Sequence, residues 1–200
     1  DLTTHISVVS ESPLVSELLN SISGLLAILN EHRQIISLNE SFLKLIGIDN
    51  PEEALGMRPG EVLNCIHAHE ESGGCGTARA CATCGAAMAI LASIEKDRPV
   101  EKVCVLSAKR KGQDIDLVMI VRSQPIVLEG RRFLLLFLQD ITRQQQQAAL
   151  EKTFFHDINN MLMSLQGASE MLQEEHPSEL ATIIRQVATR LNSEVAIQRT

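Results

Sequence analysis

The sequence predicts an α+β fold, in which an antiparallel sheet covered by helices on one face is followed by a long helical hairpin. The order of the patterns supports this: two β-like runs, a block of short helices, three more β-like runs and then helical periodicity. The 200 residues, 44% of them hydrophobic, can form one core and one further small unit. We expect an N-terminal helix and linker over 1–20, the sheet domain over 21–142 and the helical hairpin over 143–200.

The first elements are a helix and a β-hairpin. After a start that we expect to be frayed, Ser12 is a candidate N-cap and Pro13 suits the first helical position. The short apolar runs 25–29 and 34–38, separated by polar residues, predict two strands joined as a hairpin. Short helices are expected next, over 39–47, 50–55 and 58–64.

The second half of the sheet domain begins with a helix. Residues 84–95 are rich in Ala, Leu, Ile and Met, a composition that favours helix. Three β-like runs follow, with glycine-containing turns between them, and they predict the remaining strands at 100–106, 114–128 and 131–141.

Composition excludes several classes of protein. A formal net charge of −7 and the lack of Trp and Tyr argue against a nucleic-acid-binding surface. The longest apolar stretches, such as 133–138, are too short to cross a bilayer, and the N-terminus has no signal pattern. Five cysteines, an odd number with four crowded together, predict reduced thiols or ligands in the cytoplasm. Because the first residue is Asp1, we expect the chain to be a piece of a longer protein.

The sheet region resembles the PAS domain family. The stretch "LLAILNEHRQIISLNESFLKLIG" at 25–47 is similar to the first two strands and first helix of that family. The motif "LQDIT" at 138–142 resembles the exit from the last PAS strand into a signalling helix. The resemblance covers 21–142 and implies a sensory domain.

Beyond residue 142 the sequence predicts two helices that need a partner. Apolar residues recur at spacings of three and four over 150–172, the pattern "HPSE" interrupts them, and the spacing resumes over 180–195. A single hairpin leaves much of this apolar surface exposed, so two hairpins are expected to pair as a four-helix bundle. The sequence therefore predicts a homodimer, with Ile158 and Leu165 buried in it. The apolar positions are Leu150, Phe154, Ile158, Met161, Leu165, Ala168 and Leu172, then Leu180, Ile184, Val187, Leu191 and Val195.

One histidine faces away from this apolar stripe. His156 lies about 200 degrees around the helix axis from Phe154 and equally far from Ile158. Asp157 is its neighbour, and Asn160 follows four residues on, on the same exposed face. By itself, such a histidine is most often a plain surface residue.

The combination of a PAS-like domain, an exit helix and an outward His-Asp pair resembles the sensor histidine kinases. The resemblance implies that His156 is the phosphoacceptor, that Asp157 accepts the proton from its other ring nitrogen, and that Asn160 orients water for dephosphorylation. It also implies a response regulator receiver domain as partner. The sequence around the histidine lacks the Glu and Pro common nearby in the family, which indicates a divergent branch.

No glycine-rich phosphate loop appears in this sequence, so the ATP-binding domain of such kinases is not predicted here. We expect this fragment of an ATP-dependent protein histidine kinase to be inactive alone and to meet ATP only through a separate catalytic domain.

Four cysteines between residues 65 and 84 are candidate ligands of one centre. The spacing of these four includes a single C-x-x-C motif, whereas structural zinc sites usually have two; the four are Cys65, Cys75, Cys81 and Cys84. An iron–sulfur cluster is the favoured interpretation, with Zn²⁺ and a thiol switch as alternatives. The region also resembles the cysteine-rich "GCGT...C..CGA" pattern of certain PAS domains in bacterial sensor kinases, which does not identify the metal.

Other residues near the cysteines have weaker claims. His67 and His69 are second-rank candidate ligands, and "CATCGA" lacks the histidine that covalent haem attachment requires. Cys104, inside a β-like run, is interpreted as a small buried hydrophobe.

The predicted function is therefore the sensory, dimerisation and phosphoacceptor part of a two-component sensor histidine kinase. Its four-cysteine centre would sense redox state, oxygen or metal and control autophosphorylation of His156. The alternative is a non-enzymatic, zinc-stabilised dimeric PAS binding module.

Overall fold

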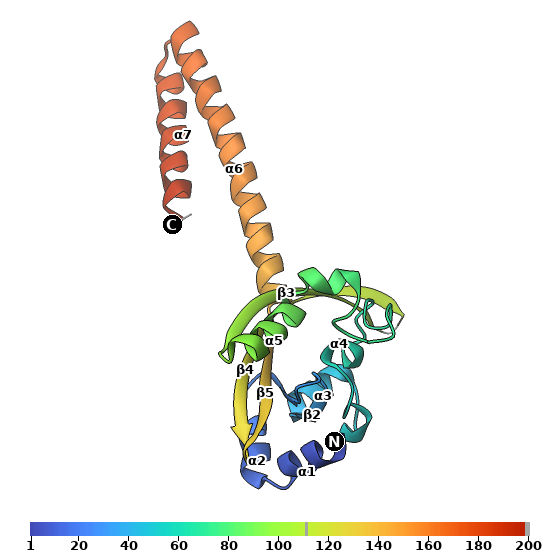
Figure 1. The fold of residues 1–200 in the computed structure, drawn as a ribbon. Helices are drawn as coiled ribbons and strands as arrows, with labels where there is room; N and C mark the ends of the chain where they lie inside the picture. The colour runs from blue at the N-terminus through green and yellow to red at the C-terminus, as the bar shows by residue number, and fades with distance from the viewer. Residues whose placement is uncertain (111, 199–200) are drawn as a thin grey trace. The chain divides into compact units, whose positions relative to one another are not determined.

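The computed structural model describes residues 1–110 and 112–198, which divide into two compact units, Asp1–Thr142 and Arg143–Thr200. The first unit contains the sheet and the second contains two long helices (Figure 1). Each unit is described by itself.

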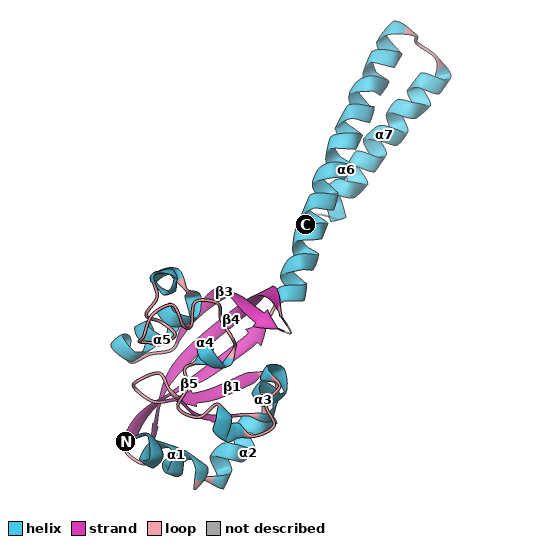
Figure 2. Cartoon of the chain, turned by 90° about the vertical axis from the view of Figure 1, so that its right-hand side faces the viewer, coloured by secondary structure: helices cyan, strands magenta, loops and turns pink. Residues whose placement is uncertain are grey.

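The first unit is built on a five-stranded antiparallel sheet with the strand order β2-β1-β5-β4-β3. β1 and β2 form the predicted N-terminal hairpin, and β3, β4 and β5 follow one another as a meander (Figure 2). β5 then pairs with β1, so the last strand closes the sheet beside the first. The prediction of five antiparallel strands is confirmed. The strands are β1 Leu25–Leu29, β2 Ile35–Leu38, β3 Val100–Arg110, β4 Gln113–Leu128 and β5 Arg131–Asp140.

Three α-helices lie between β2 and β3 along the chain, and the helix predicted over 50–55 is only a short 3₁₀ turn. A buried asparagine, Asn39, fixes the first of them: its side-chain oxygen accepts hydrogen bonds from the backbone N–H of Phe42 and Leu26. One side-chain oxygen thus caps α3 and ties it to β1. Gly47, with φ of 71°, ends this helix in the left-handed conformation. The elements are α3 Glu40–Ile46, α4 Pro59–Val62 and α5 Gly85–Lys96, with 3₁₀ turns at Pro51–Glu53 and Arg79–Thr83.

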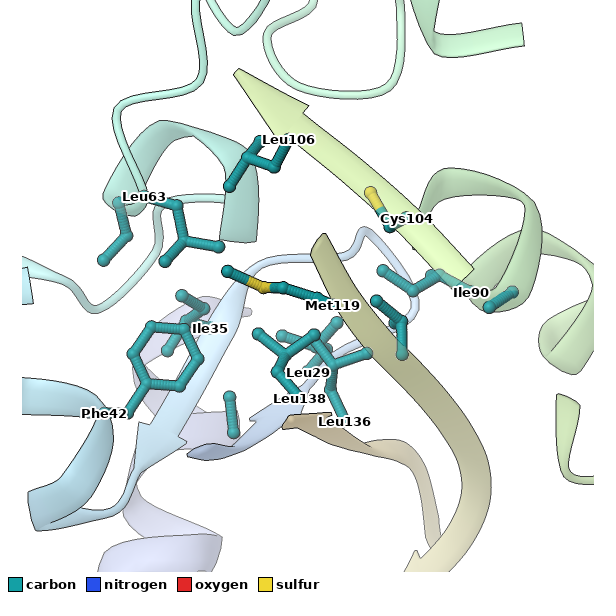
Figure 3. Close-up of a cluster of buried hydrophobic side chains, with 14 of the residues drawn as sticks. Leu29, Ile35, Phe42, Leu63, Ile90, Cys104, Leu106, Met119, Leu136 and Leu138 are labelled. Carbon is teal, nitrogen blue, oxygen red and sulfur yellow. The ribbon is translucent and has the colours of Figure 1, made fainter. Parts of the chain in front are cut away.

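The larger core lies between the sheet and these helices. Met119 and Leu136 of the central strands meet Phe42 of α3 and Ile90 of α5, and all four are buried (Figure 3). Cys104 of β3 belongs to the same core and is 3% exposed, in agreement with its predicted burial. This core forms one wall of the candidate site below.

The opposite face of the sheet has a smaller core, which corrects the prediction of helices on one face only. α1 (Leu2–Ser10) and α2 (Pro13–Ser21) bring Val9 and Leu19 against Leu26 and Phe133. The predicted frayed start is therefore wrong for residues 2–10, which form a helix capped by the Asp1 side chain. Apolar contacts with strands distant in sequence stabilise this helix, and local spacing does not reveal them.

The second unit consists of α6 (Thr142–Glu175) and α7 (Glu179–Gln198), the predicted helical hairpin. Small residues line the contact between the helices: Ser169, Ala181 and Ala188 are buried there with Leu162. The side chain of Asn192 on α7 donates a hydrogen bond of 2.9 Å to that of Gln166 on α6. No helix of the described residues is both long and apolar enough to span a membrane.

The predicted apolar stripe lies mostly outside the contact between α6 and α7. In the single chain Leu165 is 43% exposed and Ile158 is half-buried, so their burial depends on the predicted homodimer. We name this exposed surface the free stripe. Its members are Leu150, Phe154, Met161, Leu165 and Leu172 on α6 and Leu180, Ile183, Val187 and Leu191 on α7. Ile183 was not among the predicted positions, and the predicted Ile184 is half-buried.

Candidate functional site: a cysteine-lined cavity and an exposed histidine

All five cysteines line one cavity in the first unit. The floor of the cavity is the inner face of the sheet, and α4, α5 and the loop between them form its wall. Its volume is about 50 Å³, several times the ~10–15 Å³ that one water molecule requires. The four cysteines predicted as ligands are therefore brought together, and Cys104, which was not predicted as a site residue, joins them.

Gly60 of α4 makes the approach of two cysteines possible. A Cβ at this position would lie 2.5 Å from Sγ of Cys75 and 3.5 Å from Cβ of Cys65. Any larger residue would displace Cys75 from the cavity. Cys65 is held separately, because it forms a bridge with Ala108 at the edge of β3. The glycine in "RPGEVLNC" was the sequence signal for this approach, and sequence reasoning missed it.

A charged clamp holds the glycine-rich loop in place. The carboxylate of Glu61 accepts hydrogen bonds from the backbone N–H of Arg58 (2.8 Å) and of Cys75 (3.1 Å). The guanidinium of Arg58 donates to the carbonyl oxygens of Gly73 and Cys75. Gly74, with φ of 75°, lets the loop turn above the carboxylate. Arg58 and Glu61 thus fix the path of the loop around Cys75 through hydrogen bonds to its backbone.

Cys84 and Cys104 are in direct contact. Cys84 is the N-cap of α5, and its Sγ lies 3.7 Å from Sγ of Cys104 on β3. This hydrogen bond lowers the pKa of Cys84, with further help from the backbone N–H groups of Ala86 and Ala87. The same bond raises the pKa of Cys104. Cys84 therefore loses its proton more readily than Cys104 does.

Cys65 and Cys75 are in environments that favour the neutral thiol. Burial raises the pKa of Cys75 to about 11 and also raises that of Cys65. In the described ranges, 1–110 and 112–198, no three Cys, His, Asp or Glu side chains are arranged to hold a single metal ion. His67 lines the cavity, but its Nδ1 lies 2.6 Å from a carboxylate oxygen of Glu70. The thiols surround a common space without forming a preformed site for one ion.

The second group of predicted site residues lies on α6. His156 is exposed, with 72% of its side-chain surface accessible. Its Nδ1 lies 3.2 Å from Oδ1 of Asp157 and 3.3 Å from the amide nitrogen of Asn160. Both contacts are to Nδ1, and the described residues make no hydrogen bond to Nε2. The structure thus brings the three predicted residues together and leaves one ring nitrogen free.

No protein-family model and no curated protein matches the sequence. Among solved structures, the chain is similar to a PAS domain from a two-component sensor histidine kinase, with 11% identity, 66% of this chain and 96% of that chain covered, and a TM-score of 0.43. It is also similar to the PAS domain of nitrogen regulation protein NR(II) from Vibrio parahaemolyticus, with 16% identity, 65% of this chain and 100% of that chain covered, and a TM-score of 0.45. A third similar structure is the PAS domain from Bordetella pertussis BvgS, with 11% identity, 70% of this chain and 93% of that chain covered, and a TM-score of 0.41. These similarities concern the fold, and no residue role is taken from them.

The clamp yields a first prediction. Glu61→Ala removes the acceptor of the Cys75 N–H, and a hydrogen bond to a charged group contributes about 1.5–3 kcal/mol. We expect hydrogen exchange of the Cys75 amide to accelerate by about tenfold or more. The control is Glu71→Ala, which removes an exposed carboxylate from the same loop. Equal protection of Cys75 in both variants would contradict the clamp.

Proposed function

We propose that this chain is the sensory and phosphoacceptor part of a two-component sensor histidine kinase. The geometry of His156 carries the proposal: an exposed imidazole with Nδ1 beside a carboxylate and Nε2 open to solvent. A receiver domain of a response regulator would then take the phosphoryl group. The PAS-like order of elements before α6 supports a sensory role for the first unit.

The proposed reaction uses the two ring nitrogens differently. In the tautomer that directs the Nδ1 proton at Asp157, Nδ1 does not accept from the Asn160 amide, and the lone pair of Nε2 is available to attack the γ-phosphorus of ATP held by a separate catalytic domain. The new N–P bond forms as the bond between the γ-phosphorus and the bridging oxygen breaks, and ADP leaves. Asp157 accepts the Nδ1 proton, which removes the positive charge that would develop on the ring. Asn160, on the same face, is suited to orienting the water used in dephosphorylation.

The free stripe supports a homodimer. Nine large apolar side chains of the two helices form it, and apolar area of this kind on a helical hairpin is typically covered by another helix pair. A second copy of the hairpin matches this stripe by its length and apolar spacing. His156 lies away from the stripe around the helix axis. The proposed dimer therefore leaves the phosphoacceptor accessible.

For the cavity, we propose an iron–sulfur cluster held by Cys65, Cys75, Cys81 and Cys84. Four thiols around one space are the donor set that such clusters use. Arg33 also lines the cavity together with Arg58, and both would offset the negative charge of a thiolate-ligated centre. The cluster would supply sensitivity to oxygen or redox state. Zinc is the alternative occupant, for which the thiols would need to move closer together.

The route from cavity to histidine runs along β5. Leu136 and Leu138 of this strand line the cavity, and the chain then continues through Ile141 into α6. Oγ1 of Thr142 accepts a hydrogen bond of 2.9 Å from the N–H of Val118. A change in the cavity that shifts β5 would therefore reach the first turn of α6 through covalent and hydrogen bonds.

The phosphoacceptor assignment predicts the behaviour of two histidine variants. In a chain joined to its ATP-binding domain, His156→Gln should abolish acid-labile phosphate without weakening dimerisation, because Gln lacks the nucleophilic ring nitrogen. His176→Gln, at the exposed residue directly after α6, is the control and should phosphorylate normally. Undiminished acid-labile phosphate in His156→Gln would refute the assignment.

The homodimer predicts a difference between two faces of α6. Leu165→Glu places a charge in the free stripe, and the lost Leu side chain alone is worth about 2–5 kcal/mol in a core. Light scattering should show at least about 30-fold weaker dimerisation. Met163→Glu, on the other side of the helix and 67% exposed, should dimerise like the parent chain. A parent chain that is monomeric would overturn the proposal.

The cluster predicts metal content and colour. Anaerobically purified protein should contain iron and sulfide and absorb visible light strongly, and Cys75→Ser and Cys81→Ser should lose both signals. These two variants should also exchange hydrogen faster over residues 65–84, since the metal stabilises that loop. Cys104→Ser is the control and should retain the metal. A colourless protein that contains zinc would support the binding-module alternative instead.

A further inference from the structure

Cys104 is more than a packing residue. Its Sγ lies 3.7 Å from Sγ of Cys84, and no other pair of cysteines in the described chain is hydrogen-bonded. The two residues come from different elements, since Cys84 precedes α5 and Cys104 lies within β3. Their contact is therefore a product of tertiary packing.

A glycine brings the two thiols together. A Cβ on Gly85 would collide with the carbonyl oxygen of Val103 and lie 3.1 Å from Cα of Cys104. The first turn of α5 therefore lies directly against the backbone of β3, at the position where Cys104 stands. Because the backbones are already this close, rotation of the two side chains can bring the sulfurs to the ~2.05 Å of a disulfide.

We propose that Cys84 and Cys104 form a peroxide-reactive dithiol, which hydrogen peroxide oxidises to an intramolecular disulfide. The two differ in access: Cys84 is half-exposed, whereas Cys104 is 3% exposed. Peroxide therefore reaches Cys84 first, and Cys104 is the resolving thiol. Both sulfurs line the cavity, which has room for a molecule as small as peroxide.

The chemistry occurs in two balanced steps. The sulfur of Cys84 attacks one oxygen of hydrogen peroxide and the O–O bond breaks; the departing hydroxide takes up the proton of the Cys84 thiol, which yields a sulfenic acid and one water. The sulfur of Cys104 then attacks the sulfur of Cys84 and the S–O bond breaks. The departing hydroxide takes the Cys104 proton as a second water. The thiols lose two electrons, and one peroxide is reduced to two waters.

The disulfide would join the start of α5 to β3 and remove Cys84 from the set of free thiols. This dithiol is independent of the proposed cluster, because it is assigned to the metal-free chain. The proposed cluster uses Cys84 together with Cys65, Cys75 and Cys81. Because a Cys84 in a disulfide cannot be a ligand, disulfide formation would prevent assembly of the cluster. Oxidation at this pair thus makes the cavity responsive to peroxide even without a metal.

The test uses the reduced, metal-free chain treated with hydrogen peroxide, then alkylated and digested with trypsin. The cysteines fall on three separate peptides, 45–79, 80–96 and 103–109. Mass spectrometry should find a cross-link between 80–96 and 103–109, with the loss of two hydrogens. Since Cys81 shares a peptide with Cys84, Cys81→Ser should keep the cross-link. A cross-link that disappears in Cys81→Ser, or that joins 45–79 to 80–96, would overturn the proposal.

Two further variants identify the roles within the pair. Cys104→Ser and Cys104→Ala should both lose the cross-link and accumulate a Cys84 sulfenic acid, which dimedone traps. Gly85→Ala, which separates α5 from β3, should slow disulfide formation. Formation of sulfinic acid on Cys84 of the parent chain, with no cross-link, would show that Cys104 does not resolve it. These readouts involve neither metal nor phosphate, so they stand or fall apart from the proposed sensor function.

Discussion

The cysteine cavity depends on two close approaches, that of α4 to the cysteine loop and that of α5 to β3. Gly60 of α4 allows Cys75 to come within contact of the helix backbone, and Gly85 of α5 places that helix against Val103 of β3. At both contacts a side chain would occupy the space that a cysteine or a strand backbone now fills. A larger residue at either position would have to displace one of these neighbours, and the arrangement of the thiols around the cavity would change with it.

Patterns of local origin could be predicted from the sequence. The strands of the first unit and its helices other than α1 follow from alternation, caps and turn residues, and Asn39 lies where a cap is expected. His156, Asp157 and Asn160 meet because helical geometry alone places residues one and four apart on one face. The meeting of these three side chains therefore needs no tertiary information, and the structure reproduces the arrangement that helical spacing predicted.

Contacts between distant segments could not be predicted in the same way. Twenty residues separate Cys84 from Cys104, and their meeting depends on how α5 crosses β3. α1 is stabilised by packing on strands that follow it in sequence, so its own residues did not predict it. In the hairpin, apolar spacing identified the free stripe, while Ala181, Ala188 and Ser169 make the contact between the helices. Small residues allow close helix packing but have no hydrophobic periodicity that sequence reasoning can detect.

The junction between β5 and α6 explains how a small change in the cavity could matter at a distance along the chain. Oδ1 of Asp140 accepts from the N–H of Thr142 at 2.9 Å, and the N–H of Ile141 donates to the carbonyl of Val118 at 2.8 Å. Ile141 and Thr142, at the end of the first unit, are thus hydrogen-bonded to both β4 and the end of β5. From Thr142 to His156 the helix makes about four turns without a proline or glycine. This uninterrupted stretch of α6 connects the first turn of the helix to the histidine that we propose as the phosphoacceptor.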